Sequence, residues 1–145
     1  MTKRRYHFIA VLFSVIVITV AVFAFYKSDY RTKPLQDVVT VDPQEVTEVS
    51  LNSPYLNTGF HSTTDPQKIN ILVHYLKDTG YQRLNNDQSS YMPTRAAMIY
   101  LYENDKTDFL IPYEKEVMIN HKVYRVKNQD IDNQFLQDFY LSLEE

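Results

Sequence analysis

An unbroken apolar run near the start of the chain most limits what this sequence can form. The run extends from Phe8 to Phe25, reads FIAVLFSVIVITVAVFAF, and has Ser14 and Thr19 as its only polar residues. A helix of about 20 such residues spans the hydrocarbon core of a bilayer. A helix that packs on a small soluble core keeps a polar stripe, and this run has none. We therefore predict a transmembrane helix over residues 7–26, held in the membrane by contacts with lipid.

The residues around this run predict how the helix is oriented. The cluster Lys3–Arg5 precedes the run, and a basic flank of this kind stays in the cytoplasm. Tyr6 and Tyr26 bracket the run, where amphipathic rings prefer the membrane interface. The prediction is a single-pass protein of the cell membrane, with a cytoplasmic tail over residues 1–6 and a C-terminal domain outside the cell.

A cleaved signal peptide is the alternative to this anchor. A cleavage site after Ala24 would have small side chains at its −3 and −1 positions, which are Val22 and Ala24. The apolar run is 18 residues long, whereas the apolar region of a signal peptide has about 7–15 residues. This length favours an uncleaved signal anchor.

Charge and composition exclude several classes of function. Residues 1–33 hold six basic residues and one acidic residue, whereas residues 34–145 hold 9 basic and 17 acidic residues. An acidic domain is repelled by nucleic-acid backbones and by anionic lipid, so we expect no nucleic-acid partner. The chain has no Cys and two Gly, which excludes disulfides, thiolate metal sites and glycine-rich phosphate loops.

The residues after the apolar run divide into a tether and one domain. Residues 27–44 mix charges, contain Pro34 and Pro43, and show no helical periodicity. We expect them to form a tether, followed by an extracytoplasmic domain over residues 45–145. Strands are predicted over residues 46–51, 59–63, 96–103, 107–111, 117–119 and 123–126.

Two amphipathic helices are expected in this domain. The first has Asp65 as its N-cap, Pro66 at its first position, and apolar residues at i, i+3, i+4 and i+7, namely Ile69, Leu72, Val73 and Leu76. Gly80 is predicted to end it in a left-handed conformation. The second runs from about Ile131 to Leu143, with Asp130 as its cap.

The order of these elements is ββαββββα. Strands joined by short turns are antiparallel neighbours, and two amphipathic helices need one sheet face to pack on. We therefore predict an α+β fold with two layers, in which an antiparallel sheet of about five to six strands carries both helices on one face. Pro112 is predicted to end the strand over residues 107–111, because proline cannot donate to a strand ladder.

Four segments of the domain follow one another in a fixed order, namely VTEVSL, TTDPQKI, AAMIYLYEN and KVYRV. This order resembles that of a group of small extracytoplasmic domains from Gram-positive bacteria. Those α+β domains of unknown function follow a lipoprotein signal or a membrane anchor, and the resemblance covers roughly residues 45–127. It implies a place outside the membrane and a binding or accessory role. It carries no catalytic residues over to this chain, which also lacks the Cys of the lipoprotein members.

Support for catalytic, cofactor and metal sites is weak in this sequence. The histidines of the outer domain, His61, His74 and His121, form no closely spaced pair along the chain. Neither GxSxG nor SxxK, the patterns of common serine nucleophiles, is present. We therefore expect a non-catalytic protein without a metal ion or cofactor, and keep a small envelope hydrolase as the less favoured alternative.

Tyrosines supply the candidate binding face. In the strand over residues 96–103, alternation points Ala97, Ile99 and Leu101 toward the helices and points three larger side chains, Met98, Tyr100 and Tyr102, to the open face. Tyr124 is expected to extend this face, with Tyr91 and Tyr113 as further candidates. Tyrosine is enriched at protein interfaces, although it also simply favours strands.

The function predicted from the sequence is therefore a membrane-anchored binding or accessory module. Its partner is expected to be an envelope protein or a wall-associated ligand, met through the tyrosine-bearing face. An immunity or inhibitor protein acting on an envelope enzyme is the alternative, because the acidic balance of the domain suits a cationic target.

Overall fold

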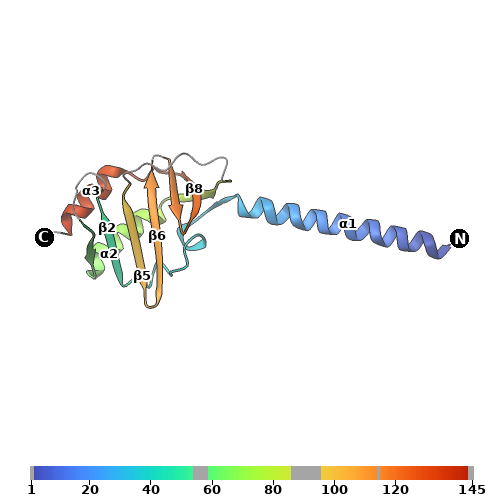
Figure 1. Cartoon of the computed structure of the whole chain (residues 1–145), viewed down its shortest axis with the longest axis horizontal. Helices are drawn as coiled ribbons and strands as arrows, with labels where there is room; N and C mark the ends of the chain where they lie inside the picture. Colours follow the sequence, from blue (N-terminus) through green and yellow to red (C-terminus); the bar gives the residue numbers. More distant parts are fainter. Residues whose placement is uncertain (1, 54–58, 86–95, 114, 144–145) are drawn as a thin grey trace. The chain divides into compact units, whose positions relative to one another are not determined.

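The computed structural model describes residues 2–53, 59–85, 96–113 and 115–143, and the chain forms two compact units, Met1–Arg31 and Thr32–Glu145. The first unit consists of helix α1, Thr2–Asp29 (Figure 1). Its segment Val11–Ser28 is long and apolar enough to cross a membrane, and none of that segment is buried inside the protein. By length and composition, α1 therefore has the properties of a signal anchor or a signal sequence.

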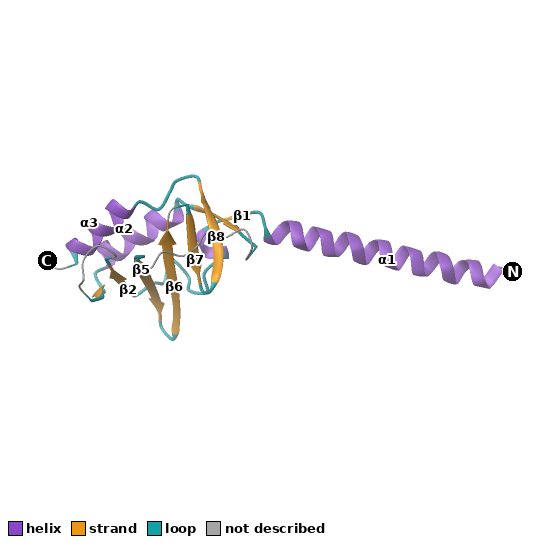
Figure 2. Cartoon of the chain, turned by 45° about the horizontal axis from the view of Figure 1, so that its top comes forward, coloured by secondary structure: helices purple, strands orange, loops and turns teal. Residues whose placement is uncertain are grey.

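The second unit is built on one antiparallel sheet (Figure 2). In the described part of the chain this sheet has eight strands, in the order β1-β4-β8-β7-β6-β5-β2-β3. The strands are β1 Thr32–Lys33, β2 Glu48–Asn52, β3 His61–Thr63, β4 Gly80–Arg83, β5 Met98–Glu103, β6 Lys106–Tyr113, β7 Glu116–Ile119 and β8 Lys122–Lys127. The α+β class and the antiparallel sheet are confirmed, but the sheet has eight strands rather than five or six because β1 and β4 were not predicted.

Two helices, α2 (Pro66–Lys77) and α3 (Asn133–Ser142), lie together on one side of the sheet (Figures 1 and 2). They contact each other through Tyr75 of α2 and Phe135 of α3, whose stacked rings have centroids 3.8 Å apart. The core lies between these helices and the sheet. Its largest fully buried side chains include Tyr81, Tyr140, Leu72, Leu76, Ile99 and Leu101.

The start of α2 is confirmed and its predicted end is wrong. The Asp65 side chain caps the helix by accepting the Gln67 N–H at 2.8 Å, and Pro66 is the first helical residue. Asp78, in a right-handed conformation, is the C-cap, whereas Gly80 has no positive φ and begins β4. Glycine is needed there for a different reason, because an added Cβ would lie 2.7 Å from the Thr32 methyl group.

Helix α3 begins two residues later than predicted. Its N-cap is Asp132, which accepts the Gln134 N–H at 2.9 Å, and not Asp130. The Tyr75 hydroxyl explains the shift, because it donates to the Asp130 carbonyl at 3.2 Å and accepts from the Asp132 N–H at 2.7 Å. These bonds hold the chain extended before the helix, and the side chain of Ile131 is buried there.

Pro112 does not end its strand. Strand β6 continues to Tyr113, and Pro112 lies opposite Val117 of β7. The Phe109 N–H points toward β7, where it donates to the Asn120 side chain. Because successive N–H groups alternate in a strand, the Pro112 nitrogen points to the other side, beyond Leu110, where the ladder with β5 has ended. Its missing donor therefore breaks no bond of the ladder.

The folded unit begins at Thr32 rather than near residue 45, so the predicted tether over residues 27–44 is too long. Strand β1 pairs with β4, and the 3-10 helix η1, Leu35–Asp37, follows it. Leu35 and Val41 are 0 % and 2 % exposed and belong to the core. Most of residues 52–58 and 85–94, which connect the predicted strands and helices, fall outside the described residues.

Candidate binding face

Strand β5 presents the two faces that its sequence predicts. Ile99 and Leu101 are fully buried and face the helices, with Ala97 just before the strand. Met98, Tyr100 and Tyr102 alternate with them and are partly exposed on the opposite side of the sheet. We call this opposite side the open face.

Aromatic rings gather on the open face around Tyr100. The Phe60 and Tyr100 rings meet edge to face at 5.5 Å, and the Tyr102 and Phe109 rings lie 6.2 and 6.4 Å from that of Tyr100. The His121 ring meets Phe109 edge to face at 4.9 Å. Phe60 is 48 % exposed. We call these five residues the aromatic row: Phe60, Tyr100, Tyr102, Phe109 and His121.

Hairpin geometry aligns the row. The β5–β6 hairpin pairs Glu103 with Lys106 and therefore Tyr100 with Phe109. The predicted strands over residues 96–103 and 107–111 leave a three-residue turn over residues 104–106 instead. That turn would shift the register by one residue and point the Phe109 side chain to the buried face of the sheet. In the β7–β8 turn, Asn120 and His121 have φ values of 47° and 66°, the left-handed pair typical of a tight hairpin. This turn brings His121 next to Phe109.

Three of the four predicted face residues share the open face, and Tyr124 does not. Tyr124 lies opposite Val117, is 5 % exposed, and packs in the core on the helix side. The sequence gives no register between β8 and β5, so alternation alone could not assign its side. Of the two further candidates, Tyr113 is 4 % exposed, and Tyr91 lies outside the described residues.

The Tyr102 hydroxyl group is a hydrogen-bonding group of the row. Partial burial raises the pKa of Tyr102 above its usual value, and the neighbouring Glu48 carboxyl adds to the effect. Tyr102 therefore stays neutral at physiological pH and presents a hydrogen-bonding group rather than a charge. Its ring supplies apolar contact area beside that group.

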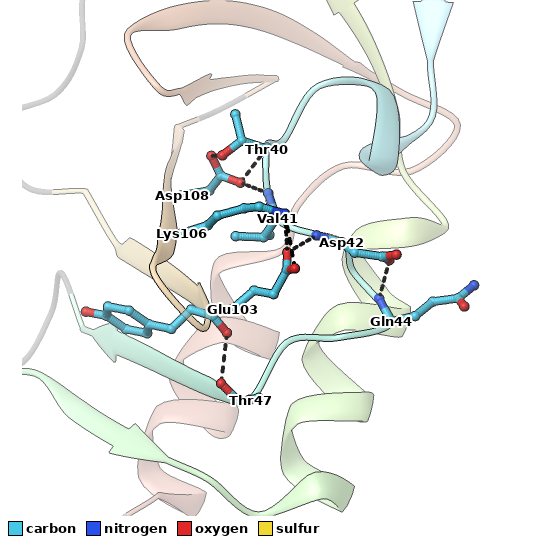
Figure 3. A network of polar contacts seen from close by, with 9 residues as sticks. Thr40, Val41, Asp42, Gln44, Thr47, Glu103, Lys106 and Asp108 are labelled. Atoms are coloured by element: carbon cyan, nitrogen blue, oxygen red, sulfur yellow. Dashed lines mark hydrogen bonds and ion pairs between the residues drawn. The ribbon is translucent and has the colours of Figure 1, made fainter.

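A separate polar cluster lies on the helix side of the sheet, around residues 34–47 (Figure 3). We call this segment the clasp. Asp108 of β6 is fully buried and accepts from the Thr40 N–H at 2.6 Å, the Thr40 hydroxyl at 2.8 Å and the Val41 N–H at 2.7 Å. Asn120 also donates to the Asp108 carboxyl. One carboxyl group thus satisfies donors of a segment that has no strand partner for them.

Glu103 of β5 holds the next residue of the clasp. Its carboxyl group accepts from the Asp42 N–H at 2.6 Å and from the Lys106 ammonium group at 3.1 Å. These hydrogen bonds, that of Asp42 first, lower the pKa of Glu103 below its usual value. Both Glu103 and Asp108 are thus occupied in holding the clasp, and a structural role accounts for them.

A depression of about 460 Å³ lies along the clasp, with Thr40, Asp42, Lys77 and Lys106 in its lining. A second, of about 320 Å³, lies between Pro43 and α2. The described residues contain no group of three or more His, Asp or Glu side chains placed to hold a metal ion. The His74 and Asp78 side chains face each other at 3.9 Å as an exposed surface pair.

Comparisons with models of protein families, with curated proteins and with solved structures find no match for this chain. The resemblance to small Gram-positive extracytoplasmic domains therefore stays a prediction. Functional arguments for this chain depend on its own surfaces, and the aromatic row is the candidate on the open face.

Proposed function

We propose that this chain is a membrane-anchored, non-catalytic binding module whose aromatic row contacts another protein of the cell envelope. The observation that carries the proposal is the line of ring contacts from Phe60 through Tyr100 and Phe109 to His121 on the sheet side away from the helices. Tyrosine and phenylalanine are enriched at the centres of protein interfaces, where they supply large contact areas.

The Tyr100 and Tyr102 rings are nearly parallel, with an interplanar angle of 20°, but the ring geometry on either side of them favours a protein partner over a glycan. Tyr100 and Phe109 receive the rings of Phe60 and His121 edge to face, with interplanar angles of 66° and 74°. Such a surface offers ring edges and grooves between rings, which suit apolar side chains. A sugar chain would stack best on rings that lie flat in one plane. A wall-associated glycan is therefore the alternative outcome of the test.

The anchor gives the proposed module its mechanism. Helix α1 confines the domain to the membrane, so its effective concentration toward a partner in the same membrane rises. A modest affinity at the aromatic row then suffices for stable association. The positive-inside rule predicts that this encounter occurs on the outer side of the cell membrane.

The test combines capture with a measured affinity. Tagged full-length protein is crosslinked in membranes beside Tyr100→Ser/Tyr102→Ser, and any captured protein is purified and titrated against both forms. We expect one envelope protein whose affinity falls about tenfold or more in the double variant. Folding should be preserved at a cost of about 1–2 kcal/mol, because both side chains are partly exposed and each lost cross-strand contact is small.

Ile71→Ser is the matched control, since Ile71 is 52 % exposed on the helix side of the domain. It removes an exposed apolar side chain without touching the row and should leave the affinity unchanged. Equal loss in both variants, or no loss in the double variant, contradicts the proposed face. Unfolding of the double variant would show that Tyr100 and Tyr102 belong to the core.

Salt separates this proposal from an immunity or inhibitor protein that uses the acidic surface. Contacts made by neutral rings depend little on ionic strength, whereas an acidic surface on a cationic enzyme loses affinity steeply as salt rises. A glycan partner would show as binding to purified wall fragments that the Tyr100→Ser/Tyr102→Ser variant loses.

A further inference from the structure

Charged residues are segregated across the eight-stranded sheet. The three strands β1, β4 and β8 lie side by side at one edge, carry five Lys and Arg residues, and contain no Asp or Glu. The three strands β5, β2 and β3 at the other edge contain Glu48 and Glu103 and no Lys or Arg. We call the first group of strands the basic edge.

A depression lies at the end of this basic edge. It has a volume of about 350 Å³, and its described lining includes Lys115, Arg125, Lys127 and Asp130. Val126 donates its N–H to the Lys115 carbonyl at 2.9 Å, which fixes the Lys115 backbone beside β8. Arg125 and Lys115 are exposed and Lys127 is partly exposed. Among the described residues, three cations thus line one concave surface together with the Asp130 carboxyl group, and Glu116 of β7 lies opposite Arg125.

The short connection between α1 and β1 limits the distance between the end of the helix and the first residue of the strand. Only Tyr30 and Arg31 separate the last residue of α1, Asp29, from Thr32 of β1. Even fully extended, this connection spans only about 10 Å. This limit comes from covalent geometry and holds for every orientation of the two units. If α1 crosses a membrane, β1 and its neighbours therefore lie close to the membrane surface.

We propose that the basic edge docks on the anionic lipid headgroups of the membrane that holds α1, with Arg125, Lys127 and Lys115 contacting the lipid phosphates. The proposal rests on the membrane anchoring in the proposed function. The docked sheet would have a fixed orientation and would hold Tyr100 and Tyr102 of the aromatic row, three strands away from β8, about 14 Å along the sheet.

Net charge opposes this docking only at long range. The domain as a whole is acidic, and the sequence alone therefore predicts repulsion from anionic lipid. Charges separated by more than about 8 Å are largely screened at physiological salt. The local surface therefore decides the interaction at contact, and at this edge it is basic. Lys and Arg residues that lie at an anionic membrane surface are attracted to its lipids over this short range.

The experiment uses the full chain in lipid nanodiscs. A single Cys replaces Val123, on the open face of β8 two residues before Arg125, or Ser62 of β3 at the opposite edge. The native chain has no Cys, so a fluorophore labels one position. Quenching by nitroxide-headgroup lipid then reports how close the fluorophore lies to the lipid headgroups. It is measured in discs of phosphatidylcholine, with or without phosphatidylglycerol.

We expect phosphatidylglycerol to increase quenching at residue 123 and to leave residue 62 unchanged. Arg125→Gln/Lys127→Gln should lower the docked-to-undocked ratio about 30-fold, the factor that two surface cations contribute, and should return quenching to its level in neutral discs. Lys77→Gln/Lys106→Gln, which removes two cations beside the clasp, should keep the increase.

Equal quenching in neutral and anionic discs overturns the proposal, and so does a response at residue 62 as large as that at residue 123. A parent-like response of Arg125→Gln/Lys127→Gln also overturns it. Failure of the anchor is distinguishable, because the chain then separates from the discs during size-exclusion chromatography before any quenching is measured.

Discussion

At the scale of single residues, the buried carboxyl group of Asp108 holds the clasp against the sheet. It is fully buried, and its carboxyl group accepts hydrogen bonds from two backbone N–H groups and a hydroxyl group of the clasp. In Asp108→Asn, an NH₂ group replaces one acceptor and faces N–H donors. We expect a loss of about 3 kcal/mol in the free energy of unfolding, because buried donors are left without partners.

Urea unfolding of the full-length protein in detergent micelles measures this loss. Asp105→Asn is the matched control, since Asp105 is exposed in the turn between β5 and β6. Its stability should stay within about 0.5 kcal/mol of the parent. If Asp108→Asn is as stable as Asp105→Asn, the Asp108 carboxyl group does not hold the clasp.

Glu103 makes the same clasp sensitive to acid. Hydrogen bonds from the Asp42 N–H and Lys106 lower its pKa in the folded protein. A group whose pKa is lower in the folded state stabilises the protein above its unfolded pKa, and the effect disappears as the pH falls through the folded value. Stability should therefore decline below about pH 4.3, the ordinary pKa of glutamate, and Glu103→Gln should reduce that decline.

The measurement is the urea midpoint as a function of pH for the parent, Glu103→Gln and Glu45→Gln. Glu45 is an exposed glutamate of the clasp and controls for the general effect of removing a carboxyl group. An acid decline in Glu103→Gln as steep as in the parent would mean that Glu103 does not contribute.

At the scale of elements, Gly80 joins three strands. An added Cβ would lie 2.7 Å from the Thr32 methyl group, 3.2 Å from the Asn128 amide and 3.3 Å from the Lys127 Cβ. Gly80→Ala should therefore push β1 away from β4 and cost about 1–3 kcal/mol, the usual penalty for overpacking. Gly59→Ala is the control, because nothing lies within 4 Å of its added Cβ.

A second substitution identifies the cause of that loss. Thr32→Ala removes the methyl group that is too close, so Gly80→Ala/Thr32→Ala should recover part of the stability lost in Gly80→Ala, as measured by urea unfolding. If the two substitutions are simply additive, the contact with β1 is not what requires glycine.

Elements with local signals could be predicted, and those held by distant partners could not. The N-cap of α2 depends on Asp65 and Pro66, which adjoin the helix they start. The strands β1 and β4 pair Thr32 with Gln82, and a two-residue strand has no periodicity to recognise. The cap of α3 moves from Asp130 to Asp132 because Tyr75, more than fifty residues away, bonds to the chain between them.

The candidate face divides in the same way. Tyr100 and Tyr102 follow from alternation within one strand, whereas Phe109 requires the hairpin register and Tyr124 requires the register of β8. The sequence does contain a signal for the clasp. Along their strands, Asp108 points to the same face as Leu110, and Glu103 points to the same face as Leu101. A carboxyl group in the phase of buried residues indicates buried donors nearby, although it does not identify them.

At the scale of the whole molecule, the proposed function requires α1 to remain as a membrane anchor. Its span is apolar and exposed, so we expect the chain to stay in the membrane pellet after alkaline carbonate extraction, with the mass of all 145 residues. Cleavage after Ala24 would instead yield a shorter, extractable chain. Val17→Arg, near the middle of the apolar run, should impair insertion, because a central Arg costs about 3 kcal/mol.

The orientation of α1 is open to direct labelling because the chain has no native Cys. The basic cluster Lys3–Arg5 predicts an inner N-terminus. A Cys in place of Ser62, which is exposed on β3, should therefore react with a membrane-impermeant maleimide in intact cells, whereas a Cys in place of Thr2 should react only after lysis. The opposite pattern would place the aromatic row in the cytoplasm and exclude an outer envelope partner, whereas reaction at both positions would show that α1 does not span the membrane.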